Sequence, residues 1–178
     1  AQIGSVQIAA RRLQSLLNDY GAVGLMACVD AILEGTERRI RQLISGWPDG
    51  EYIGETFIDD DGFDAEMIPI RAKVTIRGDT MAIDLSESSP QVTGFINSAY
   101  ANTRSLAHVA IMYMAPSDIP KNEGSMRPIS VIAPKGLIVN PHPPAPVCMS
   151  TNHCGEEIVE AIFKALAPVV PEADRKST

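Results

Sequence analysis

The chain has 178 residues and a mass of 19.1 kDa, which fits one domain or a substantial part of a larger one. Its formal net charge of −7 and sequence pI near 4.9 disfavour nucleic acid or an anionic membrane as a partner, because both attract basic surfaces. The sequence has no unbroken apolar run of about 18 residues and no charged start followed by an apolar stretch, so we expect neither a membrane-spanning helix nor a signal peptide.

Two helices are predicted over residues 1–46. Apolar residues recur there at steps of three and four, which is the helical period: Ile3, Val6, Ala10, Leu13 and Leu17. Gly21 is a natural terminator of the first helix. A second helix is predicted over residues 23–45, with Gly35 as a weak point and with its charged residues 34–41 as a solvated face.

A three-stranded antiparallel meander is predicted over residues 51–85. The turn Trp47-Pro48-Asp49-Gly50 comes first, because Pro presets φ and Gly accepts a positive φ. After it the pattern changes to partial alternation over residues 51–58, 68–76 and 81–85, which is typical of strands. The clusters Asp59-Asp60-Asp61-Gly62 and Arg77-Gly78-Asp79 are the expected turns between the strands.

A polar loop at residues 86–94 leads into a helix predicted over residues 97–115, with Asn97 as a candidate cap. The remaining residues, 116–178, are rich in proline, and we predict short strands at 129–132 and 137–139 and a last helix at about 155–166. The fold class is therefore α+β, with a small antiparallel sheet, long helices at the N-terminus and further helices after the sheet.

The cysteines Cys28, Cys148 and Cys154 do not have the spacing of a zinc clamp. We expect free thiols in a reducing, cytoplasmic compartment. The chain begins without an initiator Met and its first residues already have the helical pattern, so we interpret residues 1–178 as a single segment of a longer polypeptide. Such a segment is expected to expose apolar surface that other parts of the protein cover.

The aspartate-rich turn does not match a calcium-binding EF-hand loop. If Gly62 takes the sixth position of such a loop, Phe57 takes the first and Ile68 the twelfth, and neither side chain can bind calcium. No nucleophile elbow, phosphate-binding loop or HExxH zinc motif is present either. Local motifs alone leave the function open.

The sequence contains three histidines. We expect His108 to be a packed, hydrogen-bonded residue of a helix, and His142 to lie on a rigid surface loop between prolines. His153 lies in the polar stretch 150–155 directly before the last helix, where Thr151 or Asn152 can cap the helix. A thiol nucleophile activated by His153 is disfavoured, because Cys154 is its direct neighbour and successive side chains point apart.

The order of short motifs along the chain is distinctive, although each one is common turn chemistry. The motifs are Ala1-Gln2-Ile3, Ala9-Ala10-Arg11-Arg12-Leu13, Asn18-Asp19-Tyr20-Gly21, Trp47-Pro48-Asp49-Gly50-Glu51-Tyr52, Asp59-Asp60-Asp61-Gly62, Ile83-Asp84-Leu85-Ser86, Ser88-Ser89-Pro90-Gln91, Asp118-Ile119-Pro120-Lys121-Asn122-Glu123-Gly124, Arg127-Pro128-Ile129, Ala133-Pro134-Lys135-Gly136 and Pro144-Ala145-Pro146-Val147. Taken together over nearly the whole chain, this series resembles the hydantoinase B/oxoprolinase family.

The resemblance implies a B-type subunit that works beside an ATP-binding A-type partner in a hetero-oligomer. In such enzymes ATP activates a cyclic amide such as a hydantoin, 5-oxoproline or a related lactam, and water then opens the ring. Relatives in the same superfamily carboxylate ketones such as acetone or acetophenone, and a non-catalytic assembly domain is a third possibility. The resemblance also implies a divalent metal bound by an N-terminal part that these residues lack, so no metal or other cofactor is assigned to this segment.

The resemblance assigns no catalytic residue here. In many members an Asn-x-Glu-Thr-like stretch precedes the last helix, where this chain has residues 151–156, Thr-Asn-His-Cys-Gly-Glu. This difference suggests a different substrate. The predicted substrate-binding residues are Ser89, Gln91 and Asn97 as polar contacts, with His153 and Glu156 tuning the site.

Overall fold

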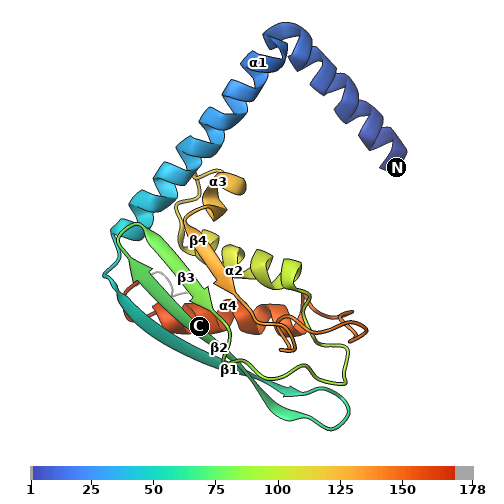
Figure 1. Cartoon of the computed structure of the whole chain (residues 1–178), viewed down its shortest axis with the longest axis vertical. Coiled ribbons are helices and arrows are strands. Elements are labelled where there is room, and N and C mark those ends of the chain that lie inside the picture. The colour runs from blue at the N-terminus through green and yellow to red at the C-terminus, as the bar shows by residue number, and fades with distance from the viewer. Residues whose placement is uncertain (1, 171–178) are drawn as a thin grey trace.

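A four-stranded sheet with helices packed on one face forms the body of the protein, and a long bent helix projects from it (Figure 1). The computed structural model describes residues 2–170, so the segment predicted over residues 116–178 is compared only as far as residue 170. The elements are α1 (Gln2–Ser45), β1 (Gly50–Asp60), β2 (Glu66–Arg77), β3 (Thr80–Asp84), α2 (Tyr100–Met114), α3 (Glu123–Met126), β4 (Ile129–Ile132) and α4 (His153–Leu166). The predicted α+β class is confirmed.

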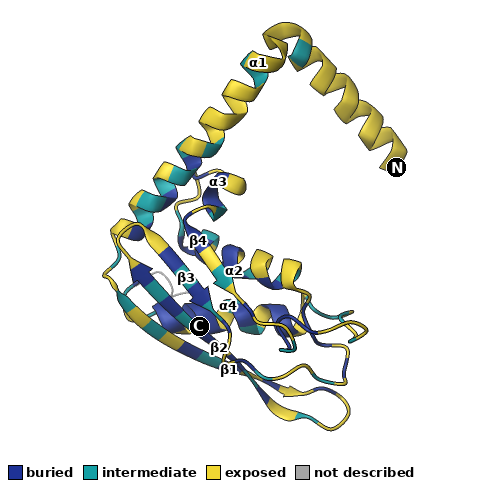
Figure 2. Ribbon diagram, in the orientation of Figure 1, coloured by how far each residue is buried: buried dark blue, intermediate teal, exposed yellow. Residues whose placement is uncertain are grey.

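The two predicted N-terminal helices form the two arms of α1. They meet at Gly21, which has φ 66° and ψ 163°. Glycine has no Cβ to oppose a positive φ, so the chain bends there and helix resumes beyond it. The first arm, residues 2–20, and the upper part of the second arm lie away from the body (Figure 2), and Val23 beside the bend is 86% exposed.

Contrary to the sequence-based expectation, α1 is long and apolar enough to cross a membrane, judged by length and composition alone. An 18-residue window of it has a mean hydropathy of 1.4 and is 0% buried within the structure. The sequence criterion required an unbroken apolar run and so missed a window that includes scattered polar residues. The exposed apolar surface expected of a segment is thus present, on α1.

The three-stranded antiparallel meander predicted over residues 51–85 is confirmed as β1, β2 and β3, and the strand predicted at 129–132 joins it as a fourth strand, β4. β1, β2 and β3 pair antiparallel in sequence order, and β4 then pairs parallel with β3, with Met81 opposite Ile129. The parallel strand requires a long connection, and α2 and α3 lie in it. Residues 137–139 form no strand, because Leu137 makes only isolated bridges with Pro90 and Asn140.

The face of the sheet that packs on α4 forms the core. Alternate residues of β2 are buried, as expected for a strand with one covered face: Ile68, Ile70, Ala72, Val74 and Ile76. Ala72 pairs with Gly54 of β1, and a Cβ added to Gly54 would lie 2.0 Å from the backbone oxygen of Ala161 in α4. β1 therefore lies so close to α4 that only glycine fits at that position.

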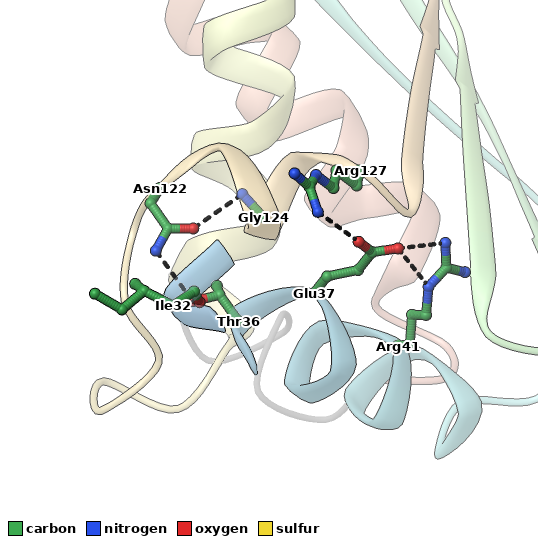
Figure 3. A network of polar contacts seen from close by, with 7 residues as sticks. All are labelled: Ile32, Thr36, Glu37, Arg41, Asn122, Gly124 and Arg127. Carbon is green, nitrogen blue, oxygen red and sulfur yellow. Dashed lines mark hydrogen bonds and ion pairs between the residues drawn. The ribbon is translucent and has the colours of Figure 1, made fainter. Parts of the chain in front are cut away.

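Polar contacts with the segment around α3 hold the lower end of α1 to the body (Figure 3). Asn122 caps α3 by accepting the Gly124 N–H at 2.9 Å, and its amide nitrogen donates to the Thr36 hydroxyl at 3.0 Å. The Glu37 carboxylate accepts hydrogen bonds from Arg41 at 2.8 and 2.9 Å and from Arg127 at 3.2 Å. Hydrogen bonds from Arg41 and then Arg127 lower the pKa of Glu37.

These contacts change the interpretation of the charged stretch 34–41, which is not simply a solvated face. Arg39 of the same stretch donates to the Asp118 carboxylate at 2.6 Å. Two segments far apart in sequence, residues 36–41 and 118–127, therefore meet at one end of α1. The charged residues position this helix on the body.

Two predicted helix caps and one predicted hydrogen bond are wrong. α2 begins after Ala99 with no side-chain cap, and Asn97 binds the preceding loop instead. α4 begins at His153 after Asn152, which also makes no side-chain cap. His108 is buried in α2 as expected, but neither ring nitrogen has a hydrogen-bond partner.

Candidate functional site

A cavity of about 360 Å³ lies where the end of β1 and the turn after it meet the first turn of α4, and we call it the α4 cavity. Its wall combines apolar and acidic side chains with one histidine: Phe57, Ile58, Asp59, Asp60, Asp61, Phe95, Ile96, His153 and Glu157. The two phenylalanines are partly exposed while the two isoleucines are buried. A small organic molecule can therefore contact both apolar surface and charge here.

Asp61 lies in the wall of the α4 cavity and binds four backbone N–H groups. Its Oδ1 accepts the backbone N–H groups of Phe63, Asp64 and Ala65 at 3.0, 3.1 and 3.0 Å, and its Oδ2 accepts that of Gly94 at 2.9 Å. Burial acts to raise the pKa of Asp61, but these four donors outweigh it and the pKa is lowered. Asp61 therefore carries its charge while it joins the turn of residues 61–65 to the loop at Gly94.

Glu157 is the titratable group of the α4 cavity whose carboxyl group lacks a hydrogen-bond donor. Its Oε2 is buried and has no hydrogen-bond partner, which in residues 2–170 is otherwise true only of the His108 nitrogens. Burial raises the pKa of Glu157 to about 7, and the nearby carboxylates of Glu156 and Glu160 add to this although its own backbone N–H opposes it. A buried carboxyl oxygen without a donor is costly unless a bound molecule supplies one.

Of the predicted substrate-binding residues, only His153 lines the α4 cavity. It is the exposed first residue of α4 and lies one helical turn before Glu157. Glu156 lines a different hollow of about 490 Å³ between α2 and α4, together with Tyr113 and Phe163. The two neighbouring glutamates therefore face different surfaces of α4.

Ser89 and Gln91 lie in the polar loop and Asn97 follows it, and all three make contacts that stabilise the loop. Asn97 is fully buried, and its amide nitrogen donates to the carbonyls of Val92 and Gly94 at 2.9 Å and of Pro146 at 3.1 Å, while its oxygen accepts the Val92 N–H. Gln91 accepts the His142 N–H at 2.7 Å. The backbone of Ser89 bonds Pro69 and Ile138. A role of these three in substrate contact stays a prediction.

Sequence reasoning missed Glu157, Asp61 and the two phenylalanines. One signal for Glu157 was available: it lies three residues after Cys154 and four before Ala161, both fully buried, so it continues the apolar stripe of α4. A carboxylate within such a stripe is unusual in a helix. No comparable signal existed for Asp61, because its donors come partly from Gly94, 33 residues away.

The side chains of the α4 cavity do not fit a metal ion. Both oxygens of Asp61 are used by N–H donors, and no three His, Cys, Asp or Glu side chains within residues 2–170 are grouped to hold one. The divalent metal implied by the resemblance stays a prediction for residues outside this chain.

The comparisons with known proteins identify the family. The sequence model of the family described as hydantoinase B/oxoprolinase matches residues 1–176 of this chain. The chain belongs to the hydantoinase B/oxoprolinase family. It is 36% identical to the beta subunit of the caprolactamase of Pseudomonas jessenii, over 97% of this chain and 30% of that one. It is 34% identical to a chain of Pseudomonas sp. (strain NS671) that is provisionally named as the B-type subunit of a D-/L-hydantoinase, over 96% of this chain and 31% of that one.

Two solved structures have the same fold as this chain. The crystal structure of the ATP-dependent caprolactamase from Pseudomonas jessenii matches with a TM-score of 0.89 and 34% identity, over 97% of this chain and 30% of that chain. A nucleotide-free acetone carboxylase matches over 90% of this chain with a TM-score of 0.73 but 17% identity, which shows a shared fold alone. The chain thus spans about 30% of the length of the two curated relatives named above.

Proposed function

We propose that this chain forms part of the B-type subunit of an ATP-dependent cyclic amide hydrolase that opens a hydantoin, 5-oxoproline or related lactam ring. The observation that carries the proposal is the likeness to the ATP-dependent caprolactamase, because it combines sequence and fold over 97% of the chain. The α4 cavity is the place in this chain where we expect the ring to bind. The reaction is completed by residues outside the chain.

The chemistry explains why such an enzyme needs ATP. An amide carbonyl is stabilised by resonance and is a poor electrophile, and a phosphoryl group on its oxygen makes the carbon open to attack by water. In our proposal ATP is bound by an A-type partner, and the metal is bound elsewhere in the enzyme. The contribution of this chain is to bind and orient the ring and to exclude water from its apolar side through Phe57 and Phe95.

The exposed α1 supports a role in assembly as well. Soluble monomers rarely expose a large contiguous apolar surface, and such surfaces mark interaction sites. The first arm and the bend expose Ile3, Val6, Leu13, Tyr20 and Val23. We propose that other parts of a hetero-oligomeric enzyme, including the A-type subunit, cover this surface. We favour protein over a lipid bilayer as the cover, because the caprolactamase relative is by name one subunit of a multi-subunit enzyme.

We also propose a cytoplasmic location, which fits the use of ATP and the absence of disulfides among the three cysteines. The alternative activity, ketone carboxylation, has the support of the fold that this chain shares with acetone carboxylase. The lower sequence identity to that enzyme makes it the second candidate. A purely structural assembly domain is the third.

One assay separates these candidates. The intact protein that contains this chain is purified with its A-type partner, and ATP hydrolysis is measured with hydantoin, 5-oxoproline, ε-caprolactam and acetophenone. We expect a cyclic amide to stimulate ATP hydrolysis and to yield the ring-opened product. Stimulation by acetophenone with bicarbonate, and by no cyclic amide, would replace our proposal with the carboxylase. No stimulation by any of the four compounds would favour the assembly domain.

A further inference from the structure

The wall of the α4 cavity has an apolar part and an acidic part, and this division affects which substrates can bind. Phe57, Phe95 and the buried isoleucines Ile58 and Ile96 offer an apolar surface to a ring of methylene groups. The rest of the wall is acidic, with the carboxyl groups of Asp59, Asp60, Asp61 and Glu157 and no lysine or arginine. Apart from His153, the polar side chains that a molecule meets here are all carboxyl groups.

We propose that the α4 cavity selects cyclic amides that carry no carboxylate, with the carboxyl group of Glu157 accepting a hydrogen bond from the ring N–H. The inference rests on the proposed function and narrows it to a class of substrate. Glu157 lines the cavity, and within residues 2–170 no group donates a hydrogen bond to its Oε2, so its carboxyl group can accept one from a lactam N–H. The methylene groups of the ring then pack on the phenylalanines.

A carboxylate on the ring would be disfavoured for an electrostatic reason. Asp61 stays ionised because four backbone N–H groups bind it, so those donors are not free to bind a second anion. Asp59 and Asp60 precede it at the end of β1 and add like charge. Repulsion between like charges in a partly enclosed cavity is stronger than in bulk water, because fewer water molecules screen it.

His153 is the one side chain of the wall that could favour an anion. It lies on the exposed rim at the start of α4, whereas the acidic groups come from both β1 and α4. One exposed histidine does not balance the three aspartates of the wall. We therefore assign the preference of the cavity to the acidic groups.

A set of matched ligands tests the inference directly. 2-Pyrrolidinone, 5-oxoproline and 5-oxoproline amide share one five-membered lactam ring, and only 5-oxoproline bears a carboxylate. Binding of each is measured by ligand-observed NMR at neutral pH, with the protein in its assembled form and without ATP. We expect 2-pyrrolidinone and 5-oxoproline amide to bind at least tenfold more tightly than 5-oxoproline. Equal or tighter binding of 5-oxoproline would overturn the inference.

Variants test the role of Glu157. Glu157→Leu removes the acceptor and should weaken 2-pyrrolidinone binding at least tenfold, while Glu157→Gln retains a carbonyl acceptor and should restore most of the affinity. Glu51→Leu, at the opposite and exposed end of β1, is the matched control and should bind like the unaltered protein. Circular dichroism confirms that each variant is folded. If the Gln and Leu variants bind equally, the hydrogen bond to Glu157 is refuted.

The outcomes also distinguish this inference from the proposed function. Binding is measured without turnover, so a protein that binds neutral lactams but never hydrolyses ATP with them would refute the proposed function alone. A protein that opens 5-oxoproline in preference to its neutral analogues would retain the proposed function and refute the inference.

Discussion

His108 illustrates how a single buried residue can be packed without being hydrogen-bonded. It is 3% exposed on the inner side of α2, and neither ring nitrogen has a partner. Burial, and secondarily the charge of Arg104, lower the pKa of His108 to about 4, while Glu123 acts weakly in the other direction. The imidazole is therefore neutral at physiological pH, since its charged form would be desolvated.

The lowered pKa makes a prediction about stability. Below about pH 6.5 the unfolded chain binds a proton at His108 and the folded chain does not, so the stability of the fold should decrease as pH falls from about 6.5 to about 4. His108→Leu should remove this contribution and shift the folding equilibrium constant at pH 5 by about thirtyfold in favour of the folded state relative to the native chain. Urea unfolding at pH 7 and pH 5 measures it.

The raised pKa of Glu157 acts in the opposite direction over part of the same pH range, so only the difference between variant and native chain isolates His108. His142→Gln, which removes a histidine from an exposed loop position, is the matched control. An equal pH dependence in the His108→Leu variant would contradict the assignment.

Between elements, the contact of β1 with α4 determines the position of the α4 cavity. α4 lies across β1 and β2, and the end of β1 supplies the aspartates and Phe57 while the start of α4 supplies His153 and Glu157. The hydrogen bond from the Thr56 hydroxyl to Glu160, at 3.2 Å, joins the same two elements. The cavity wall therefore depends on how closely the helix approaches the strand.

We predict that Gly54→Ala destabilises the fold by at least about 2 kcal/mol, because the added methyl group would overlap backbone atoms of Ala161 and Ala165 that cannot move without shifting α4. Chemical denaturation measures the loss. Gly35→Ala, inside α1 where the nearest atom to the new Cβ is the end of the Arg38 side chain at 3.8 Å, is the control. It should stabilise the protein by up to about 1 kcal/mol through helix propensity. Similar effects of the two variants would refute the close contact.

For the whole molecule, the main feature is a long bent helix attached to the body at one end. The contacts of Glu37 and Asn122 fix the lower end of α1 (Figure 3). Gly124 lies so close to α1 that an added Cβ would be 2.1 Å from the Leu33 carbonyl oxygen. Beyond that anchor the helix is mostly exposed and largely apolar. A rigidly attached apolar arm is suited to bind another polypeptide.

Cysteine labelling tests this role. Cys28 is exposed on α1 and Cys148 is exposed on the body before α4, so both should react with a thiol reagent in the isolated chain. If protein covers α1 in the assembled enzyme, assembly should slow the reaction of Cys28 at least tenfold and leave Cys148 as the internal control. An unchanged rate at Cys28 in the assembled enzyme would contradict the proposed assembly surface.

The sequence by itself determined the features that depend on neighbouring residues. Helical periodicity predicted α1, and Gly21 marked its bend because only glycine adopts that φ without strain. Alternation and turn residues predicted β1, β2 and β3, and the series of motifs indicated the family. These features arise within a few residues of the chain, so a local pattern is sufficient to predict them.

Only the tertiary structure decided the features that join distant segments. The parallel pairing of β4 with β3, the four donors around Asp61 and the unpartnered carboxyl oxygen of Glu157 depend on contacts that no local pattern records. Asn97 is an instructive case, because its amide bonds to loop backbone as far away as Pro146 rather than capping the next helix. The cavity assigned to the substrate has the same origin, since β1 and α4 are almost 100 residues apart in the chain and meet only when the sheet is covered.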